Sequence, residues 1–357
     1  MKSTVKSKRI AFVIGSMGRG GAERVISILA NFYASEGWTV DILTLLDDRN
    51  EYDLNKNIFV RPICIKGRSR ITQLPNWLLS IRKYVNKKKP DVIVSFIARI
   101  NIITIIACLG LKQRIIISER NDPSADGRSV LVKIATYMLY PLADHIVFQT
   151  KWAKSCFSKR IQKKSVIIPN PISVSVSASN EKKRKIVAVG RLIEQKNHTM
   201  LINAFKKVHD EYPEYKLYIY GEGKLRDTLT SQIQELGLTE CVFLPGNVSN
   251  IHEEIADAEM FVLSSNYEGL SNALLEAMMM GLPCISTNCA GSNEVIKHEK
   301  NGLLVTIGSE EELSKAMKRI IQDPELAKRI RHNSLLSATV YDSKRVIKVW
   351  DDIINLI

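Results

Sequence analysis

Two glutamates, Glu268 and Glu276, enclose a short segment that begins with Gly269 and lies between a strand-like run and a helix ending at Gly281. A strand that opens through a glycine onto a helix directs free backbone N–H groups and the positive end of the helix dipole at one point. Carboxylates beside such a point could accept hydrogen bonds from the hydroxyls of a sugar and of a ribose that flank a diphosphate. The alternative for Glu276 is a solvated position on the outer face of the helix.

Two cationic residues follow the first strand expected in the second half of the chain. Gly190 and Arg191 come directly after Val189, and Lys196 lies five residues beyond Arg191. A planar guanidinium and a compact ammonium could converge there on one dianion. Two exposed cations without a common ligand are the alternative.

Further glycine loops follow other expected strands, at 221–223 (Gly-Glu-Gly) and 243–248. Ligands of open α/β sheets bind at the carboxyl edge of the strands, and the second loop offers backbone groups and an apolar surface to a nucleobase. A similar loop at 15–24, which includes Gly20 and Gly21, opens the first half and would let the backbone approach a ligand closely. Its spacing does not match Gly-x-Gly-x-x-Gly, so the evidence for a nicotinamide or flavin site is weak, and a tight turn is the alternative.

Strand-like and helix-like runs alternate along all 357 residues, which predicts parallel sheets with crossover helices in two domains. A serine- and lysine-rich stretch at 173–185 lacks apolar periodicity and predicts the linker, with domains at 1–177 and 178–340. The expected strands are 9–14, 39–45, 92–96, 115–118 and 145–149 in the first half, and 186–189, 216–220, 242–244, 260–263, 284–286 and 303–305 in the second.

The composition, 45% hydrophobic and 25% charged, is typical of a soluble, packed protein. The longest uncharged apolar run, 100–111, is too short to span a bilayer, and the N-terminus shows no secretory cleavage site. Six cysteines without a Cys-x-x-Cys spacing predict reduced, mostly buried thiols in a cytoplasmic protein without a zinc site.

Positive charge is concentrated in the first half of the chain. Residues 1–177 contain 29 Lys and Arg against 12 Asp and Glu, a net charge of +17, whereas residues 178–357 contain 22 against 25, a net charge of −3. Such a surplus favours an anionic partner, which could be nucleic acid, an anionic membrane face or a phosphorylated substrate. An ordinary lysine-rich solvated surface is the alternative. The residues that form the two basic clusters are Arg61, Lys66, Arg68 and Arg70, then Arg82, Lys83, Lys87, Lys88 and Lys89.

The motifs of the second half, in this order and spacing, resemble the donor half of family 4 retaining glycosyltransferases with the GT-B fold, and the loop at 18–24 resembles the start of their acceptor half. The resemblance covers nearly the whole chain. It implies an α/β protein of two facing Rossmann-like domains with a nucleotide-sugar in the cleft. It also implies a C-terminal helix at 341–357 that crosses back onto the first domain, for which Val346, Ile347, Val349 and Trp350 would supply the apolar face.

The same resemblance implies roles for individual residues. Arg191 and Lys196 would bind the donor diphosphate and stabilise its departure, Glu276 would hold the ribose and Glu268 the donor sugar. Preorganised cations and helix N–H groups can replace a divalent metal at a leaving diphosphate, and the chain has no Asp-x-Asp sequence, so we expect neither metal nor cofactor. The full donor-binding set would be Gly20, Gly21, Gly190, Gly221, Gly223, Gly246, Gly269, Leu270, Ser271 and Glu276.

One segment departs from the family pattern. Many members carry a histidine after an N-terminal-domain strand, where this chain has Ser-Glu-Arg-Asn-Asp-Pro at 118–123, and Arg120 is the expected equivalent. The acceptor-side candidates are Arg99, Glu119, Arg120 and Asn121. A related bacterial subgroup that builds capsule, exopolysaccharide and oligosaccharide-lipid precursors has similar segments, including Ser95-Phe96 with Arg99 and Asn101.

That subgroup implies UDP-galactose or UDP-N-acetylhexosamine donors and saccharide acceptors on a polyprenyl diphosphate. Such an acceptor would explain the basic half, because its diphosphate and the surrounding leaflet are both anionic. We therefore expect a cytoplasmic enzyme attached peripherally to the inner face of the cell membrane. A UDP-N-acetylglucosamine 2-epimerase shares this fold but would need no basic acceptor half. A nucleic-acid-binding protein would explain the charge but neither the paired glutamates nor the glycine loops.

Overall fold

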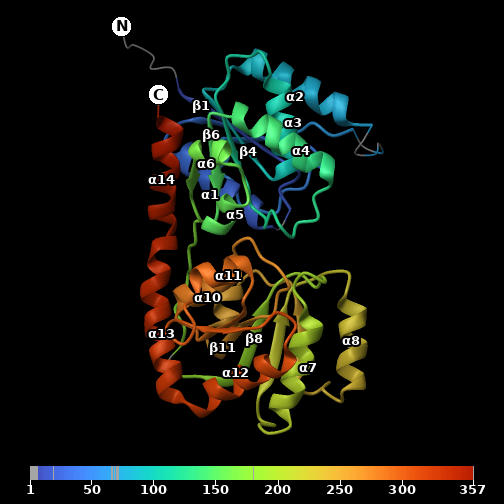
Figure 1. Cartoon of the computed structure of the whole chain (residues 1–357), viewed down its shortest axis with the longest axis vertical. Helices are drawn as coiled ribbons and strands as arrows, with labels where there is room; N and C mark the ends of the chain where they lie inside the picture. Colours follow the sequence, from blue (N-terminus) through green and yellow to red (C-terminus); the bar gives the residue numbers. More distant parts are fainter. Residues whose placement is uncertain are drawn as a thin grey trace. The chain divides into compact units, whose positions relative to one another are not determined.

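The computed structural model describes residues 7–18, 20–65, 67, 69, 72–179 and 181–356, and the chain divides into two compact units (Figure 1). The first unit comprises residues 1–171 and 344–357, and the second comprises residues 172–343. Each unit is built on one parallel sheet covered by helices, which confirms the predicted α/β class. The first boundary lies six residues before the predicted one at 177, and the returning segment begins three residues after residue 341.

The first unit contains a seven-stranded parallel sheet. Every residue of β4 and β5 is buried, as expected of strands covered on both faces, and their apolar runs made them easy to predict. The strands in spatial order are β3 (Ile58–Pro62), β2 (Thr39–Thr44), β1 (Arg9–Ile14), β4 (Val92–Phe96), β5 (Ile115–Ser118), β6 (His145–Phe148) and β7 (Ser165–Ile167).

Two strands of this sheet, β3 and β7, were not predicted, and both lie at its edges. β7 has only three residues, all half-buried, and β3 has a single buried residue, Ile58. β3 also ends in Pro62, which a sheet tolerates at an edge. Edge strands need fewer apolar residues than central ones, so their sequence signal is weak.

Helices cover both faces of the first sheet. α1 (Gly21–Ser35) and α14 (Ser343–Asn355) contribute to the apolar core on one face, and α2 (Leu74–Lys88) and α3 (Ala98–Cys108) contribute to the core on the other. The remaining helical segments of this unit are α4 (Val130–Leu139), η1 (Tyr140–Leu142), α5 (Lys151–Ser155) and α6 (Lys159–Lys163).

The C-terminal helix α14 packs on the first unit, but the prediction that Val349 belongs to its apolar face was wrong. Val346 and Trp350 are buried, and the Trp350 ring stacks on Phe96 with ring centroids 5.9 Å apart. Val349 is exposed instead. The buried face continues through Ile353 and Ile354, three and four residues after Trp350, as the period of an α-helix requires.

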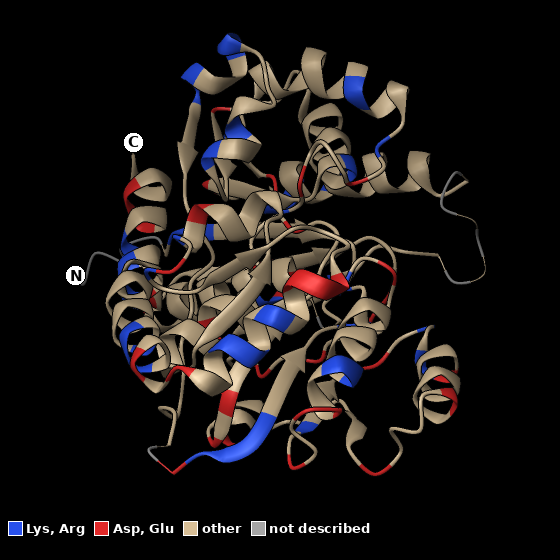
Figure 2. Ribbon diagram, turned by 60° about the horizontal axis from the view of Figure 1, so that its bottom comes forward, with Lys and Arg blue, Asp and Glu red and all other residues tan. Residues whose placement is uncertain are grey.

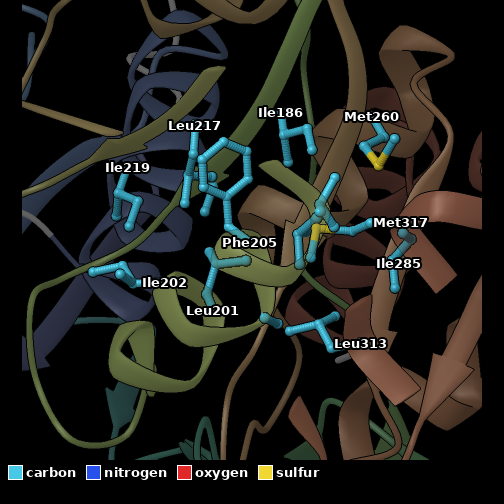
Figure 3. Packing of buried hydrophobic residues seen from close by; sticks show 14 of the residues in the cluster. Ile186, Leu201, Ile202, Phe205, Leu217, Ile219, Met260, Ile285, Leu313 and Met317 are labelled. Carbon is cyan, nitrogen blue, oxygen red and sulfur yellow. The ribbon is translucent and has the colours of Figure 1, made fainter. Parts of the chain in front are cut away.

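The second unit contains a six-stranded parallel sheet, and Figure 3 shows Phe205 of α7 in the core on one face of it, near Ile186 and Leu217 of the strands. The strands in spatial order are β10 (Val242–Gly246), β9 (Lys216–Tyr220), β8 (Lys183–Val189), β11 (Ala258–Leu263), β12 (Cys284–Thr287) and β13 (Leu303–Val305). The helical segments are α7 (His198–His209), α8 (Arg226–Glu235), α9 (Ile251–Ile255), α10 (Asn272–Met280), α11 (Ala290–Val295), α12 (Glu310–Gln322), α13 (Pro324–Ala338) and η2 (Thr339–Tyr341).

The predicted linker at 173–185 is largely part of the second unit. Ile172 is buried, and its N–H donates to the Tyr341 carbonyl at 2.9 Å. Ala178 is buried too and donates to the Met280 carbonyl at 2.7 Å, while 183–185 begin β8. Within the stretch, the buried Ala178 is an isolated apolar anchor among serines and lysines, so the sequence shows no periodicity.

Charged residues are spread over the ribbons of both units (Figure 2), and the predicted basic clusters prove to be only partly a solvated surface. Arg61 donates to the buried Asp41 at 2.5 Å, and Arg82 donates to the carbonyls of Ala107 and Leu109. Lys83, Lys87, Lys88 and Lys89 are exposed. Arg19, Lys66, Arg68 and Arg70 lie outside the described residues.

All six cysteines are free, and four of them are buried, whereas Cys64 is half-buried and Cys156 is exposed. Among the described residues, no helix combines the length and apolar character needed to cross a membrane.

Candidate active site

The glycine loops of the second unit lie side by side along the carboxyl edge of neighbouring strands. The Gly190 N–H donates to the Tyr220 carbonyl, and the Gly221 N–H donates to the Gly246 carbonyl, both at 2.9 Å. The Leu192 N–H donates to the Glu222 carbonyl at 3.0 Å. The strand order β10, β9, β8 therefore brings together three loops that are separate in sequence.

Close backbone contact explains why glycine occupies two of these positions. A Cβ atom on Gly221 would lie 2.0 Å from the Gly190 carbonyl oxygen, and one on Gly223 would lie 2.3 Å from the Leu192 carbonyl oxygen. Gly221 also has a φ of +142°, which disfavours any other residue. The loops form one packed layer at the sheet edge.

Lys196 and Glu268, predicted as separate ligand-binding groups, form an ion pair in this structure. The side chains are 12% and 8% exposed, so the pair is largely shielded from water. The hydrocarbon stem of Lys196 lies over Gly190, where a Cβ atom would meet it at 3.1 Å. The Ser265 hydroxyl donates to the same Glu268 oxygen at 2.7 Å. A cation and a carboxylate are thus fixed next to the glycine layer.

Backbone and side-chain bonds connect the loop of Lys196 to the end of β11. The Ser264 hydroxyl donates to the Lys196 carbonyl at 2.8 Å, and the Asn266 N–H donates to the Gln195 carbonyl at 2.8 Å. Gln195 in turn donates to the Tyr267 carbonyl at 3.0 Å. These bonds hold Lys196 in register with the segment that carries Glu268.

Helix α10 begins after Glu268, contains Glu276 and ends at Gly281, as the sequence predicted. The Ser271 side chain accepts from the Leu274 N–H at 3.4 Å and caps the helix, and Gly281 ends it with a φ of +82°. Leu270 packs into the apolar core beneath. Close packing of Gly291 against Gly269, where a Cβ atom would meet the carbonyl oxygen at 2.1 Å, fixes the preceding turn.

Glu276 is buried rather than solvated, which argues against its alternative as an outward-facing helix residue. A ring nitrogen of His252, on α9, lies 3.3 Å from a Glu276 carboxylate oxygen. The other ring nitrogen of His252 lies 3.1 Å from the Ser175 hydroxyl. His252 was missed because a histidine on a five-residue helix, far from Glu276 in sequence, gave no signal.

Arg191 differs from Lys196 in its surroundings. Its side chain is exposed, and within the described part of the chain no hydrogen bond or ion pair involves its guanidinium. An anion at this edge would therefore meet one open cation and one that already shares its charge with Glu268. Arg191, Lys196, Glu268 and Glu276 all belong to segments at or next to the same sheet edge.

A second buried histidine, His198, lies behind this loop. It is the first residue of α7, and Asn197 caps the helix by accepting from the Met200 N–H at 3.3 Å. Burial, followed by the nearby charge of Lys196, lowers the pKa of His198 to about 4, so the ring is neutral at pH 7. Sequence reasoning missed His198 because buried histidines are common.

The remaining predicted donor residues, Gly20 and Gly21, lie in the first unit at the start of α1. The Tyr52 hydroxyl accepts from the Gly20 N–H at 3.2 Å and donates to the Gly20 carbonyl at 2.8 Å. A Cβ atom on Gly20 would meet the Glu23 carboxylate at 2.2 Å. Because the Glu23 carboxylate ends a flexible side chain that can move, the bonds to Tyr52 rather than this contact fix the turn.

The acceptor-side candidates separate into two exposed and two buried residues. Arg99 and Asn121 are exposed. Arg120 is buried, its guanidinium carbon lies 5.1 Å from the Phe96 ring centroid and 5.4 Å from that of Trp350, and it donates to the Asn170 side chain at 2.9 Å. Burial lowers the pKa of Arg120 to about 9.

Glu119 is also buried, and protein groups bind both of its oxygens. Tyr140 donates to one of them, and Arg128 donates to the other at 3.0 Å. The Tyr140 hydroxyl further accepts from Asn101, which is buried and contacts Ser95 at 2.9 Å. In this structure Glu119 is the centre of a polar network inside the first unit.

Comparison with protein families agrees with the geometry of both units. Residues 171–335 match the family model "Glycosyl transferases group 1", and residues 19–176 match the model "Glycosyltransferase Family 4". Together the two matches account for nearly the whole chain.

Two relatives of known pathway align over almost their full length. A protein of Campylobacter jejuni, N-acetylgalactosamine-N,N'-diacetylbacillosaminyl-diphospho-undecaprenol 4-alpha-N-acetylgalactosaminyltransferase, is 28% identical over 96% of this chain and 98% of its own. The amylovoran biosynthesis glycosyltransferase AmsD of Erwinia amylovora is 25% identical over 98% of this chain and 99% of its own.

Solved structures show the same architecture at lower identity. Anabaena HepE, solved with UDP and glucose, has a TM-score of 0.83 at 17% identity and covers 98% of this chain and 100% of its own. Sucrose-phosphate synthase of Thermosynechococcus elongatus has a TM-score of 0.85 at 17% identity, over 97% of this chain and 98% of its own. The chain belongs to glycosyltransferase family 4 and has the GT-B fold.

Proposed function

We propose that this glycosyltransferase moves a hexose or N-acetylhexosamine, with retention of anomeric configuration, from a UDP-sugar to a saccharide carried on a polyprenyl diphosphate. The reaction would take place at the inner face of the cell membrane, on the cytoplasmic side, and would serve the synthesis of a cell-surface polysaccharide or glycan precursor. The observation that supports it most strongly is the placement of Arg191, Lys196, Glu268 and Glu276 along one sheet edge together with three glycine loops.

This placement suits the chemistry of a nucleotide-sugar donor. When the bond between the anomeric carbon and the diphosphate breaks, the electron pair leaves with the diphosphate and negative charge builds on its oxygens. Arg191 and Lys196 would stabilise that charge most in the transition state, which is what accelerates the reaction. Glu268 and Glu276 would accept hydrogen bonds from sugar and ribose hydroxyls. The proposal requires no divalent metal at the diphosphate.

The acceptor is inferred from relatives and from charge. The names of two Campylobacter jejuni relatives, 28% and 27% identical to this chain, place undecaprenol diphosphate in their acceptors. The first half of this chain carries the net charge of +17. Lys83, Lys87 and Lys88 on α2 are exposed, and so is Lys89, which directly follows that helix. Exposed cations suit an acceptor whose diphosphate lies at an anionic leaflet.

A panel of nucleotide-sugars tests the proposal. We expect UDP and UDP-hexoses or UDP-N-acetylhexosamines to bind and GDP-mannose to bind much more weakly, as measured by calorimetry. Transfer should then be followed with a short-chain polyprenyl-diphosphate saccharide and, separately, with the free saccharide. Transfer from GDP-mannose alone, or equal use of the free saccharide, would contradict the proposal. Formation of UDP-N-acetylmannosamine from UDP-N-acetylglucosamine without any acceptor would identify an epimerase instead.

A further inference from the structure

Helix α4 exposes its apolar side to solvent. The five large side chains on this side, Val130, Leu131, Ile134, Tyr137 and Met138, are between 51% and 78% exposed. Their spacing places them on one face of the helix, and Thr136 on the opposite side is the helix's one buried residue. Surface helices of globular proteins normally turn the apolar face inward, so a contiguous exposed face of this kind marks an interaction site.

Polar contacts at both ends add to the partial burial of the inner side of α4, where Leu139 packs against the core. Arg128, just before the helix, and Tyr140, directly after it, both donate to the buried carboxylate of Glu119. The Arg128–Glu119 distance is 3.0 Å, and both side chains are at least 95% buried. Burial, followed by the charge of Glu119, keeps the pKa of Tyr140 well above its usual value, so the hydroxyl remains a donor. Glu119 thus fixes both ends of α4 and leaves its apolar face free.

α3, which packs on α4, and α2, which packs on α3, carry positive charge only. α3 contacts both α2 and α4, and the three helices lie next to one another in Figure 1. None of the three contains an aspartate or glutamate. The cations that they contain are Arg82, Lys83, Lys87, Lys88, Arg99 and Lys133. An apolar helix face flanked by cations without acids matches a surface that is apolar inside and anionic outside.

We propose that α4 inserts its exposed apolar face into the interfacial region of an anionic lipid bilayer, while the exposed Lys83, Lys87 and Lys88 of α2 and Arg99 of α3 contact the lipid headgroups. Tyrosine and aliphatic side chains partition into that region, and neighbouring lysines add electrostatic attraction. This inference rests on the proposed function only in that a lipid-linked acceptor would be found at such a surface. It names the part of the first unit that enters the membrane, beyond a general attraction of basic residues.

The test compares three forms of the full chain by co-sedimentation with vesicles. The first is the wild type, the second carries Leu131→Gln, Ile134→Gln and Met138→Gln, and the third is a matched control with Leu336→Gln and Val340→Gln. The control residues are exposed apolar residues of the second unit. Glutamine keeps helix propensity, so circular dichroism should show all forms folded. The vesicles are phosphatidylcholine alone or mixed with phosphatidylglycerol.

We expect the wild type and the control to bind the mixed vesicles at about 0.1 M salt, and the α4 variant to bind about a hundredfold more weakly. At about 1 M salt, where screening removes most of the electrostatic attraction, the wild type should retain binding that the α4 variant lacks. Vesicle binding by the α4 variant equal to that of the wild type would overturn the proposal. So would a wild type that ignores vesicles and forms a dimer that the α4 variant cannot form.

Activity separates this inference from the proposed function. With a short-chain acceptor in solution, the α4 variant should match the wild type, because its changes are exposed residues of the first unit, whereas Arg191, Lys196, Glu268 and Glu276 belong to the second. With a long-chain acceptor embedded in vesicles, its turnover should fall at least tenfold. Loss of vesicle binding without that fall would overturn the role of α4 in acceptor access. Absence of transfer by every form would contradict the proposed function. Weaker vesicle binding by the α4 variant than by the wild type would still support insertion of α4 into the bilayer.

Discussion

Replacing Lys196 with methionine separates the two roles that the structure suggests for the Lys196–Glu268 pair. Methionine keeps much of the hydrocarbon stem that lies over Gly190 but removes the charge. We expect this change to slow turnover and to destabilise the second unit. The two effects have different causes and can be measured independently.

The loss of stability follows from the burial of the pair. Removing one partner of a buried ion pair costs about 3–5 kcal/mol, because the other charge is left without compensation. Glu268 keeps its hydrogen bond from Ser265 at 2.7 Å, and its side chain is 8% exposed. We therefore expect the lower end of that range, about 3 kcal/mol. In the double variant Lys196→Met, Glu268→Gln, most of this loss should disappear, because no buried charge remains.

The loss of activity follows from the chemistry of the leaving group. Without the ammonium, the departing diphosphate loses a preorganised cation, and turnover should fall about a hundredfold or more. Arg191→Ala should have a similar effect on turnover but almost none on stability, because the Arg191 side chain is exposed. The double variant should stay inactive even though its stability returns.

The assay can follow the two units separately. All four tryptophans, Trp38, Trp77, Trp152 and Trp350, belong to the first unit, so their emission reports its unfolding alone. A urea transition seen by circular dichroism but not by tryptophan emission would report the second unit. Lys224→Met is the matched control, because Lys224 pairs with Glu194 at 2.8 Å with both side chains more than half exposed. Such a pair contributes about 0–1 kcal/mol.

Two results would refute this reasoning. If folded Lys196→Met kept more than about a tenth of wild-type turnover, the leaving-group role of Lys196 would be wrong. If its second unit were as stable as that of Lys224→Met, burial of the pair would not carry the energy assigned to it.

Two further predictions concern the stability of the second unit, and a third concerns the reaction. Gly221→Ala should lower the free energy of unfolding by about 3 kcal/mol or more, because its Cβ would meet the Gly190 carbonyl at 2.0 Å, whereas Gly237→Ala, with positive φ but open space, should lose about 1 kcal/mol in the same urea assay. Because the pKa of His198 is about 4 in the fold and 6.5 when unfolded, the unfolded chain binds the extra proton as pH falls; stability should drop by about 2 kcal/mol from pH 7 to pH 5, and His198→Gln should lack that part of the pH dependence. Transfer should persist in EDTA and give a product with the donor's anomeric configuration by NMR; rescue by magnesium or manganese, or an inverted product, would disprove the corresponding part.

The sequence predicted the parts of the fold that depend on local pattern. Central strands such as β4 and β5 are continuous apolar runs because both of their faces are covered, and the glycine loops directly follow strands. The edge strands β3 and β7 lack that pattern, since one side of each is open. The linker prediction was wrong for a similar reason, because isolated apolar anchors such as Ala178 leave no periodicity.

The sequence indicated which charged residues would lie at the edge of the second sheet but not which of them would pair. The spacing of Arg191, Lys196 and Glu268 indicated charges at one edge, but no local pattern shows that two of them form a pair across 72 residues. His252 beside Glu276 depends in the same way on the packing of α9 against α10. Tertiary contacts decide which charges are available to a ligand.

In the first half of the chain, too, tertiary contacts decide which charges are available to a ligand. Net charge alone therefore does not show how many cations are free for a partner. Arg61 neutralises the buried Asp41, Arg82 caps carbonyls near the end of α3, and Arg128 holds Glu119. These cations stabilise the fold and are not free for a partner. The exposed cations of the first unit include Lys83, Lys87 and Lys88 of α2, Arg99 of α3 and Lys133 of α4, the helix with the exposed apolar face. Net charge therefore overstates the number of cations that are free for an anionic partner, and the membrane proposal depends on the exposed cations of α2, α3 and α4 rather than on the total.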